Sequence, residues 1–353
     1  MNHTNVTHPR HVLLGAAVAA PLPVCDHYCG VESRMRKALA LQAEMTEEFG
    51  TCVFDVTLDC EDGAPVGGEK DHAFMVSALV NQGLVATKNK AINGARRVAV
   101  RVHPVDHPAF EQDVQIVVGE AGAAWSHLML PKVDGVADVD RAARVIDAAL
   151  ASSNRAQALP LHVLIESPLA VQQVAAIAAH PRVQSLSFGL MDFVSAHGGA
   201  IPASAMAVAE PGAQTTYDQF SHPLVVRAKL EVSAACHAFG KVPSHCVVTE
   251  FKRPDVVQAA ALRASRELGY TRMWSIHPDQ IRPILAAFTP AQSEVEQASH
   301  IICAAHAADW APISVAGKLH DRASYRYYWQ VLEKAYQTAQ LDHQDPAFPY
   351  FVL

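Results

Sequence analysis

The stretch Leu161–Phe193, LHVLIESPLAVQQVAAIAAHPRVQSLSFGLMDF, contains one complete strand–helix–strand unit. Two short runs, Leu161–Ile165 and Ser185–Phe188, have the composition of strands, and Leu169–Ala179 between them has helical spacing. The first run is apolar almost throughout rather than alternating, which is typical of a strand buried on both faces. Parallel sheets are buried in this way, so the stretch predicts a parallel sheet covered by helices.

The same alternation continues on both sides of this unit. Helix-like segments recur at Asp138–Ala151, Pro223–Phe239 and Arg253–Leu268,. Eight strands separated by helices favour a closed (β/α)8 barrel, or TIM barrel. A doubly wound open sheet is the alternative, and it is disfavoured because no GxGxxG fingerprint follows any strand. The remaining candidate strands are His11–Ala17, Cys52–Leu58, Arg97–Val102, His127–Leu130, His245–Val248 and Met273–Ile276.

The barrel pattern ends near Phe288. Thr289 can cap a new helix and Pro290 suits its first turn, and a last helix reaches about Gln340. This tail is too small to fold alone. We therefore expect a catalytic barrel over residues 1–288 and a small helical C-terminal extension over residues 289–353, packed on the barrel or on a neighbouring subunit.

Composition limits the classes of function. The chain has 353 residues, of which 50% are hydrophobic and 18% charged, with a formal net charge of −7. Such a chain buries a large core, and the lack of a basic run excludes nucleic acid as a partner. The apolar segment Val12–Val24 is too short to span a membrane, so we interpret it as the first strand and its loop rather than a signal peptide.

The seven cysteines include no CxxC pair. We interpret them as reduced, mostly structural thiols and expect a cytoplasmic protein, with a zinc site as the minor alternative.

Catalytic groups of a (β/α)8 barrel follow the carboxyl ends of its strands. After the second candidate strand come Asp59, Glu61 and Asp62, three carboxylates within four positions. Like charges this close raise one another's pKa unless a cation compensates them. The turn is either a site that needs negative charge or a solvated acidic turn.

Two cationic side chains follow at the next strand ends. Arg101 lies inside an apolar run, and a buried arginine requires an anionic partner. That partner is a substrate carboxylate or a protein carboxylate, Asp59 or Glu61. Lys132 after the fourth strand suits a Schiff base or a role in holding carboxylates, and we favour the second.

Two further carboxylates, Glu166 and Asp192, lie at the mouths of the fifth and sixth strands. Oxygen ligands from two carboxylates, completed by water and substrate, suit Mg²⁺ or Mn²⁺. Either carboxylate alone also suits a helix cap. After the eighth strand, His277 and Pro278 either contact a ligand or start the next helix.

Six segments at the strand ends, given below with their residues, resemble one known family. They occur in the order of the motifs of the HpcH/HpaI aldolase and citrate lyase β-subunit (CitE-like) family, which includes malyl-CoA lyases. The tail segment GKLHD (Gly317–Asp321) resembles the tail motif of the same family, so nearly the whole chain is covered. The segments are LDCED (Leu58–Asp62), VRVHP (Val100–Pro104), LPKV (Leu130–Val133), IESP (Ile165–Pro168), GLMDF (Gly189–Phe193) and IHPDQI (Ile276–Ile281).

The resemblance implies a TIM barrel with a C-terminal extension, assembled as a trimer or hexamer. It implies that Glu166 and Asp192 bind Mg²⁺, and that Arg101 binds the oxygens of the substrate. It also implies that the tail covers the active site of the next subunit and that Asp321 transfers a proton there. The further implied site residues are Asp59 and Glu61 near the metal and its waters, and Lys132, Gly189, Met191, His277 and Pro278 around the substrate.

Several segments depart from the family pattern. CEDGA (Cys60–Ala64) replaces the usual LEDAV, and His103 replaces an Asn. An insert around Pro21–Gly30 replaces the usual FVPG-type end of the first strand, and Thr271–Trp274 replaces small residues. These changes fall where the substrate and CoA would lie.

From these observations we expect a magnesium-dependent carbon–carbon lyase. It would reversibly cleave a hydroxy-acyl thioester, linked to CoA or an acyl carrier, to a 2-oxo acid and an acyl thioester. One alternative is a CoA-independent aldolase that releases pyruvate, which needs no acid from the tail. Another is a non-catalytic subunit or ligand-binding protein on the same barrel.

Overall fold

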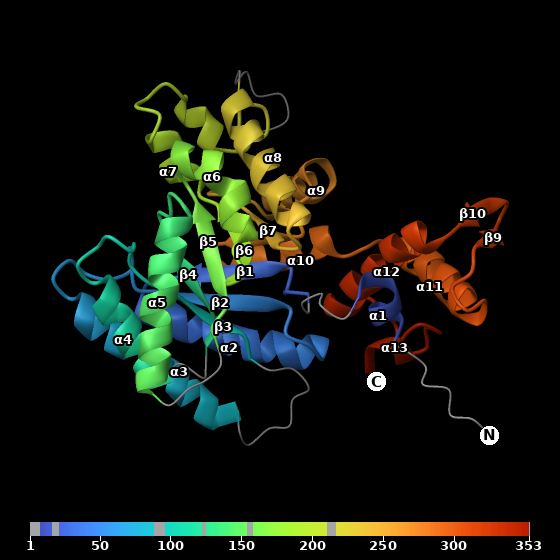
Figure 1. The fold of residues 1–353 in the computed structure, drawn as a ribbon, viewed down its shortest axis with the longest axis horizontal. Coiled ribbons are helices and arrows are strands. Elements are labelled where there is room, and N and C mark those ends of the chain that lie inside the picture. Colours follow the sequence, from blue (N-terminus) through green and yellow to red (C-terminus); the bar gives the residue numbers. More distant parts are fainter. Residues whose placement is uncertain are drawn as a thin grey trace. The chain divides into compact units, whose positions relative to one another are not determined.

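The computed structural model describes residues 8–15, 21–87, 96–121, 125–153, 158–209 and 217–352. Its centre is a closed barrel of eight parallel strands in sequential order, β1 to β8, which confirms the TIM barrel (Figure 1). The strands are β1 Cys25–Cys29, β2 Phe54–Asp59, β3 Val98–Arg101, β4 Trp125–Leu130, β5 Leu161–Ile165, β6 Val183–Phe188, β7 Val242–His245 and β8 Arg272–Ser275.

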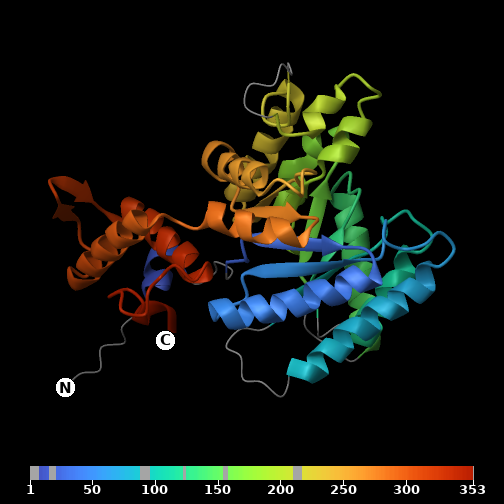
Figure 2. The same cartoon turned by 180° about the vertical axis from the view of Figure 1, so that it is seen from behind.

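Helices cover the outside of the barrel, and Figure 2 shows α2 beside β1 and β2, with α3 next to α2. Local sequence starts several of them: Ser167 accepts a hydrogen bond from the Ala170 N–H at 2.9 Å and Pro168 occupies the first turn of α6,. The helices are α2 Glu32–Phe49, α3 Glu69–Thr87, α4 Phe110–Ala121, α5 Val136–Ser152, α6 Pro168–Ala179, α7 Leu190–Ser195, α8 Pro223–Ala238, α9 Pro254–Leu268 and α10 Ile281–Phe288, with short 3-10 turns η2 Ala203–Met206 and η3 Pro278–Gln280.

The first strand differs from the prediction. A strand at His11–Ala17 is wrong, because Pro9–Leu14 form helix α1 and residues 16–17 lie outside the described residues. The first strand is β1, inside the segment that we interpreted as an insert, and it closes the barrel by pairing with both β2 and β8. Its polar Asp26 and His27 are buried, which is why no apolar run marks this strand.

The seventh strand also begins earlier than predicted. β7 covers Val242–His245 rather than His245–Val248. Its residues VPSH carry little strand signal, whereas the buried Cys246 and Val248 follow after the ladder has ended. The predicted strand was therefore placed too late, because Cys246 and Val248 are buried like strand residues but lie after the paired residues.

Contacts divide the chain into two compact units, Val24–Ala287 and a second unit of Met1–Pro23 with Phe288–Leu353. In the second unit Leu13 of α1 shares a hydrophobic core with Trp329 of α12, and Arg10 pairs with Glu333 at 2.7 Å. The first residues, which we assigned to the barrel, thus pack with the C-terminal helices. The other elements of this unit are α11 Gln292–Ala307, β9 Ile313–Val315, β10 Lys318–His320, α12 Arg322–Gln337 and α13 Pro349–Val352.

The turns after β1 and β2 touch through two glycines. A Cβ atom placed on Gly63 would lie 2.5 Å from the carbonyl oxygen of Gly30 and 2.6 Å from its Cα. No side chain fits at this contact. The glycine in CEDGA, where the related family has Ala, is therefore explained by close backbone packing.

We predict that Gly63→Ala lowers the free energy of unfolding by about 1–3 kcal/mol, because the added methyl group forces two backbones apart. Gly119→Ala is the matched control. Its Cβ would meet only Ser153 Oγ, at 3.8 Å, and alanine is the better helix former, so it should stabilise α4 by about 0.5–1 kcal/mol. Denaturant unfolding measures both, and equal effects would contradict the packing account.

Candidate active site

The guanidinium of Arg101 is the centre of the barrel mouth. Asp59 and Arg101 are partners in the register of β2 and β3. Arg101 Nε and Nη2 donate to the two carboxylate oxygens of Asp59 at 2.7 and 2.9 Å. Nη1 lies 2.8 Å from Glu61 Oε2, and Nη2 lies 2.9 Å from Asp62 Oδ2. The acidic turn is thus compensated by one buried cation, and the protein carboxylates that we considered as its partners do bind Arg101.

Asp59 is held as an anion at the base of this turn. Its carboxylate also accepts from the Glu61 N–H at 3.0 Å, from the Gly63 N–H at 2.7 Å and from the Tyr28 hydroxyl. Burial pushes the pKa of Asp59 upward, but the hydrogen bonds and charge of Arg101 outweigh it and hold the pKa below its usual value,. The fixed anion orients the guanidinium.

Tyr28 is a site residue that sequence reasoning missed. Its hydroxyl donates to Asp59 and accepts from Arg101 Nη2 at 2.5 Å. Its ring lies 4.7 Å from the Arg101 guanidinium and 5.5 Å, edge to face, from the ring of Trp274. Burial raises the pKa of Tyr28, so the hydroxyl stays protonated. No motif marked this tyrosine, because it lies in the segment Pro21–Gly30 that we interpreted as an insert.

Lys132 joins the acidic turn to Glu166. Its Nζ lies 2.7 Å from Glu61 Oε1, and its backbone N–H donates to Glu166 Oε1 at 2.5 Å. Partial burial lowers the pKa of Lys132, but the hydrogen bond and charge of Glu61 raise it above the usual value. A lysine that is more firmly protonated is a poor Schiff-base nucleophile, so the geometry favours the carboxylate-holding role.

Glu166 follows β5 directly and is buried. Burial, reinforced by the negative charges of Asp192 and Glu61, raises its pKa to about 7, although the Lys132 N–H opposes the shift,. A divalent cation bound by Glu166 and Asp192 would offset these negative charges.

Gly189 and Asp192 lie beside Glu166, and Asp192 is the second carboxylate of the predicted metal pair. A Cβ on Gly189 would lie 2.5 Å from both Cβ and Oε2 of Glu166, so only glycine leaves room for that carboxylate. Asp192 is exposed in the first turn of α7, beside the half-buried Met191. The donor set of two carboxylates fits Mg²⁺. We call the joined side chains the mouth network, which consists of Tyr28, Asp59, Glu61, Arg101, Lys132 and Glu166.

His103, which replaces the family's Asn, belongs to a separate pair beside this network. Its Nδ1 lies 2.5 Å from Asp113 Oδ2, and its backbone N–H donates to the same oxygen at 3.1 Å. The ring stacks on His107 at 4.3 Å. Burial lowers the pKa of His103, but Asp113 outweighs it and raises the pKa overall.

His277, Pro278 and Asp321 occupy helix starts. His277 Nδ1 accepts from the Asp279 N–H at 3.3 Å, and Pro278 opens η3. Asp321, in the second unit, accepts from the Ala323 N–H at 2.9 Å at the start of α12. Within the described residues we find no hydrogen bond or ion pair that joins His277 or Pro278 to the mouth network. Their expected contacts with substrate remain predictions.

The raised pKa of Glu166 predicts a pH dependence of stability in metal-free protein. A carboxyl whose pKa is higher in the folded than in the unfolded state stabilises the fold fully below about pH 4.5, and this contribution is lost as pH rises to about 7,. Relative to Glu166→Gln, wild-type protein should lose up to about 1.4 kcal/mol per pH unit across this window. Denaturant unfolding in EDTA at several pH values measures this loss. Parallel stability–pH profiles of wild type and Glu166→Gln would contradict the prediction. The control Glu44→Gln, at an exposed position of α2, should give the wild-type profile.

Comparison with known proteins agrees with this geometry. The chain matches the family described as HpcH/HpaI aldolase/citrate lyase over residues 38–278. An L-malyl-CoA/beta-methylmalyl-CoA lyase of Rhodobacter capsulatus is 30% identical over 253 residues, which cover 69% of this chain and 77% of that protein.

Solved structures extend the comparison. The crystal structure of a citrate lyase from Burkholderia xenovorans LB400 has 46% identity and a TM-score of 0.77, and the match covers 98% of this chain and 99% of that one. CitE from Mycobacterium tuberculosis, solved with magnesium, acetoacetate and coenzyme A, shares the fold at 18% identity and a TM-score of 0.62, over 89% of this chain and 98% of that one. The chain therefore belongs to the HpcH/HpaI aldolase/citrate lyase family and is a carbon–carbon lyase of the oxo-acid type.

Proposed function

We propose that this enzyme reversibly cleaves a hydroxy-acyl thioester into a 2-oxo acid and an acyl thioester, with Mg²⁺ as cofactor and Mn²⁺ as a substitute. The mouth network carries this proposal, because it joins a buried guanidinium to Glu166, one of the two carboxylates that we expect to hold the ion. In the cleavage direction the hydroxyl loses its proton, the carbon–carbon bond breaks, and the electron pair moves to the thioester fragment, which takes up a proton.

Glu166 and Asp192 would hold the ion. When bound, Mg²⁺ supplies a Lewis acid that polarises a substrate oxygen and orients the substrate. The raised pKa of Glu166 and the space that Gly189 leaves beside it support this assignment. The M. tuberculosis CitE solved with magnesium supports the choice of cation.

Arg101 would stabilise negative charge on the substrate oxygen as the bond breaks. Its donors are already occupied by protein carboxylates, so a substrate has to displace one of them. Asp62 is the partner that is easiest to displace, because its side chain is 70% exposed whereas those of Asp59 and Glu61 are buried. Asp59 and Tyr28 would keep the guanidinium in place during the exchange.

Asp321 would transfer the proton at the acyl carbon, delivered from a neighbouring subunit of a trimer or hexamer. Its exposed position at the start of α12 supports this role. A CoA-independent aldolase would not need it, so Asp321→Asn separates the two activities.

We place the enzyme in the cytoplasm, because all seven cysteines in the described part of the chain are free thiols,. Among the described helices, none is long and apolar enough to cross a membrane.

The function is tested with L-malyl-CoA and beta-methylmalyl-CoA, the thioesters in the name of the Rhodobacter relative, and with citramalyl-CoA, after a citramalyl-CoA lyase of Mus musculus that is 25% identical. We expect Mg²⁺-dependent release of a 2-oxo acid from at least one of them. Glu166→Ala and Asp192→Ala should each lower turnover by about a thousandfold, because the polarising ion is lost. Glu44→Gln serves as the control. Full activity in either alanine variant, or release of pyruvate only from free 4-hydroxy-2-oxo acids, would overturn the proposal.

A second prediction concerns Tyr28. Tyr28→Phe should lower kcat/KM about ten- to hundredfold, which corresponds to the loss of one hydrogen bond to a charged group. The affinity for Mg²⁺ should not change, since Tyr28 contacts Asp59 and Arg101 but the ion is held by Glu166. Steady-state kinetics and calorimetric Mg²⁺ titration separate the two effects. A matching loss of Mg²⁺ affinity, or a similar loss of activity in the exposed Tyr217→Phe, would contradict this role.

A further inference from the structure

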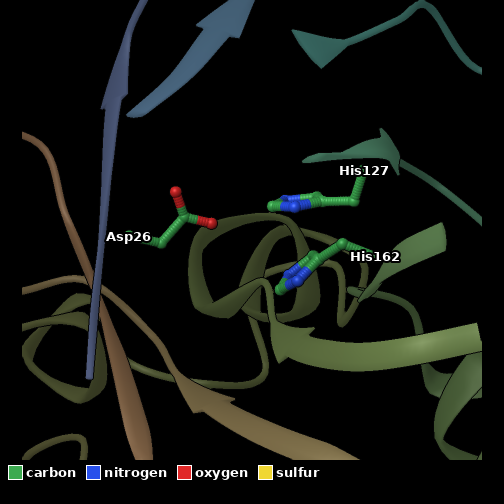
Figure 3. Close-up of side chains that lie close together, drawn as sticks. All are labelled: Asp26, His127 and His162. Carbon is green, nitrogen blue, oxygen red and sulfur yellow. The ribbon is translucent and has the colours of Figure 1, made fainter. Parts of the chain in front are cut away.

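Three buried polar side chains meet at the end of the barrel interior opposite the mouth (Figure 3). Asp26, His127 and His162 lie near the amino ends of β1, β4 and β5, whereas the mouth network follows the carboxyl ends. All three are 0% exposed, and one ligand atom from each lies within 4.8 Å of the others. Figure 3 shows the carboxylate and both rings pointing toward the same space.

Part of this group has no hydrogen-bond partner. Among the residues that the structure describes, nothing bonds to Nδ1 or Nε2 of His127, and the partner found for Asp26 Oδ2 is the ion pair with Arg272 Nη2 at 3.1 Å. Asp26 Oδ1, in contrast, accepts from Thr57 Oγ1 at 2.7 Å. Buried polar atoms are rarely left unpaired, because the lost contact with water is not replaced. An occupant that binds a carboxylate oxygen and imidazole nitrogens would satisfy them.

We propose that Asp26, His127 and His162 bind a transition-metal ion of the zinc class, separate from the catalytic Mg²⁺ at the mouth. One carboxylate and two imidazoles form a donor set that zinc prefers, whereas Mg²⁺ prefers oxygen alone. A neutral imidazole offers a metal the lone pair of the nitrogen that carries no proton, and both ring nitrogens of His127 are without a hydrogen-bond partner among the described residues.

The surroundings of His162 suit a metal ligand. Its Nδ1 and Nε2 lie 2.6 Å from Ser185 Oγ and 2.8 Å from Ser187 Oγ. A metal-bound histidine commonly keeps a hydrogen bond through its other nitrogen, which fixes the ring. The ion would replace one serine contact and leave the second to orient His162. The bound ion would then link β1, β4 and β5 across the base of the barrel.

Arg272 is the cation that opposes this site. Its Nη2 lies 3.1 Å from Asp26 Oδ2, and it donates to Asp55 Oδ2 at 2.7 Å. Asp55 also accepts from Arg97 Nε at 2.6 Å. Arg272 Nη2 is thus shared between Asp55 and Asp26, and an ion bound at Asp26 Oδ2 would replace the contact with Arg272 there. A hydroxide as the fourth ligand would offset one unit of the positive charge.

The test uses the full chain. Because the site is fully buried, the ion has to enter during folding, so the protein is expressed with added Zn²⁺ and is also refolded from denaturant with Co²⁺ alone. We expect about one Zn²⁺ per chain by elemental analysis after dialysis, and the visible absorption of four-coordinate Co²⁺ after refolding. Neither readout depends on activity, and Glu166→Ala should leave both unchanged.

His127→Gln and His162→Gln should reduce bound Zn²⁺ to background and abolish the Co²⁺ bands. Asp26→Asn, which is isosteric, is the second variant if a histidine variant fails to fold. Wild-type protein that holds no Zn²⁺ and gives no Co²⁺ bands would overturn the proposal, and so would bands that persist in folded Asp26→Asn and His127→Gln. The group would then enclose buried water instead. If the proposed lyase activity at the mouth is absent, the Zn²⁺ content and the Co²⁺ absorption are still expected. The lyase proposal and the metal-site proposal can therefore be refuted independently.

Discussion

The burial of the Arg101 guanidinium is the constraint on which the mouth of this barrel depends. A charge removed from water is tolerated only when opposite charges and hydrogen-bond acceptors surround it. Asp59, Glu61 and Asp62 supply those charges, and they in turn tolerate one another because Arg101 lies between them and Lys132 pairs with Glu61. The turn after β2, the end of β3 and the hydroxyl of Tyr28 are therefore fixed by one electrostatic requirement.

The interior of the barrel is layered in a way that follows from the two-residue period of a strand. Polar Asp26, His127, His162 and Arg272 lie near the amino ends of their strands. Two residues further along the same strands come larger and less polar side chains. These are Tyr28, Met129, Leu164 and Trp274, of which the last three form a buried cluster that Tyr28 packs against. This layer separates the imidazole groups at the base from the carboxylates at the mouth. The pKa values at each end therefore depend mainly on the charged groups at that same end.

Sequence reasoning succeeded where local pattern and burial agree. The apolar run of β5 matches the observed strand, and the polar residues after the strands lie at one mouth as the barrel requires. It failed at β1, because Asp26 and His27 make a buried strand look polar while apolar α1 looks like a strand. The bridge from Glu61 through Lys132 to Glu166 depends on which strands are neighbours. No spacing in the sequence encodes that bridge, or the meeting of Asp26 with His127 and His162.

The second unit is built from both ends of the chain. Leu13 of α1 lies in one hydrophobic core with Trp329 and Leu341, so residues made early during synthesis pack against residues made late. The barrel residues Val24–Ala287 leave the ribosome between these two sets. The barrel can therefore form first, and the apolar face of α1 is buried only after α12 has been synthesised.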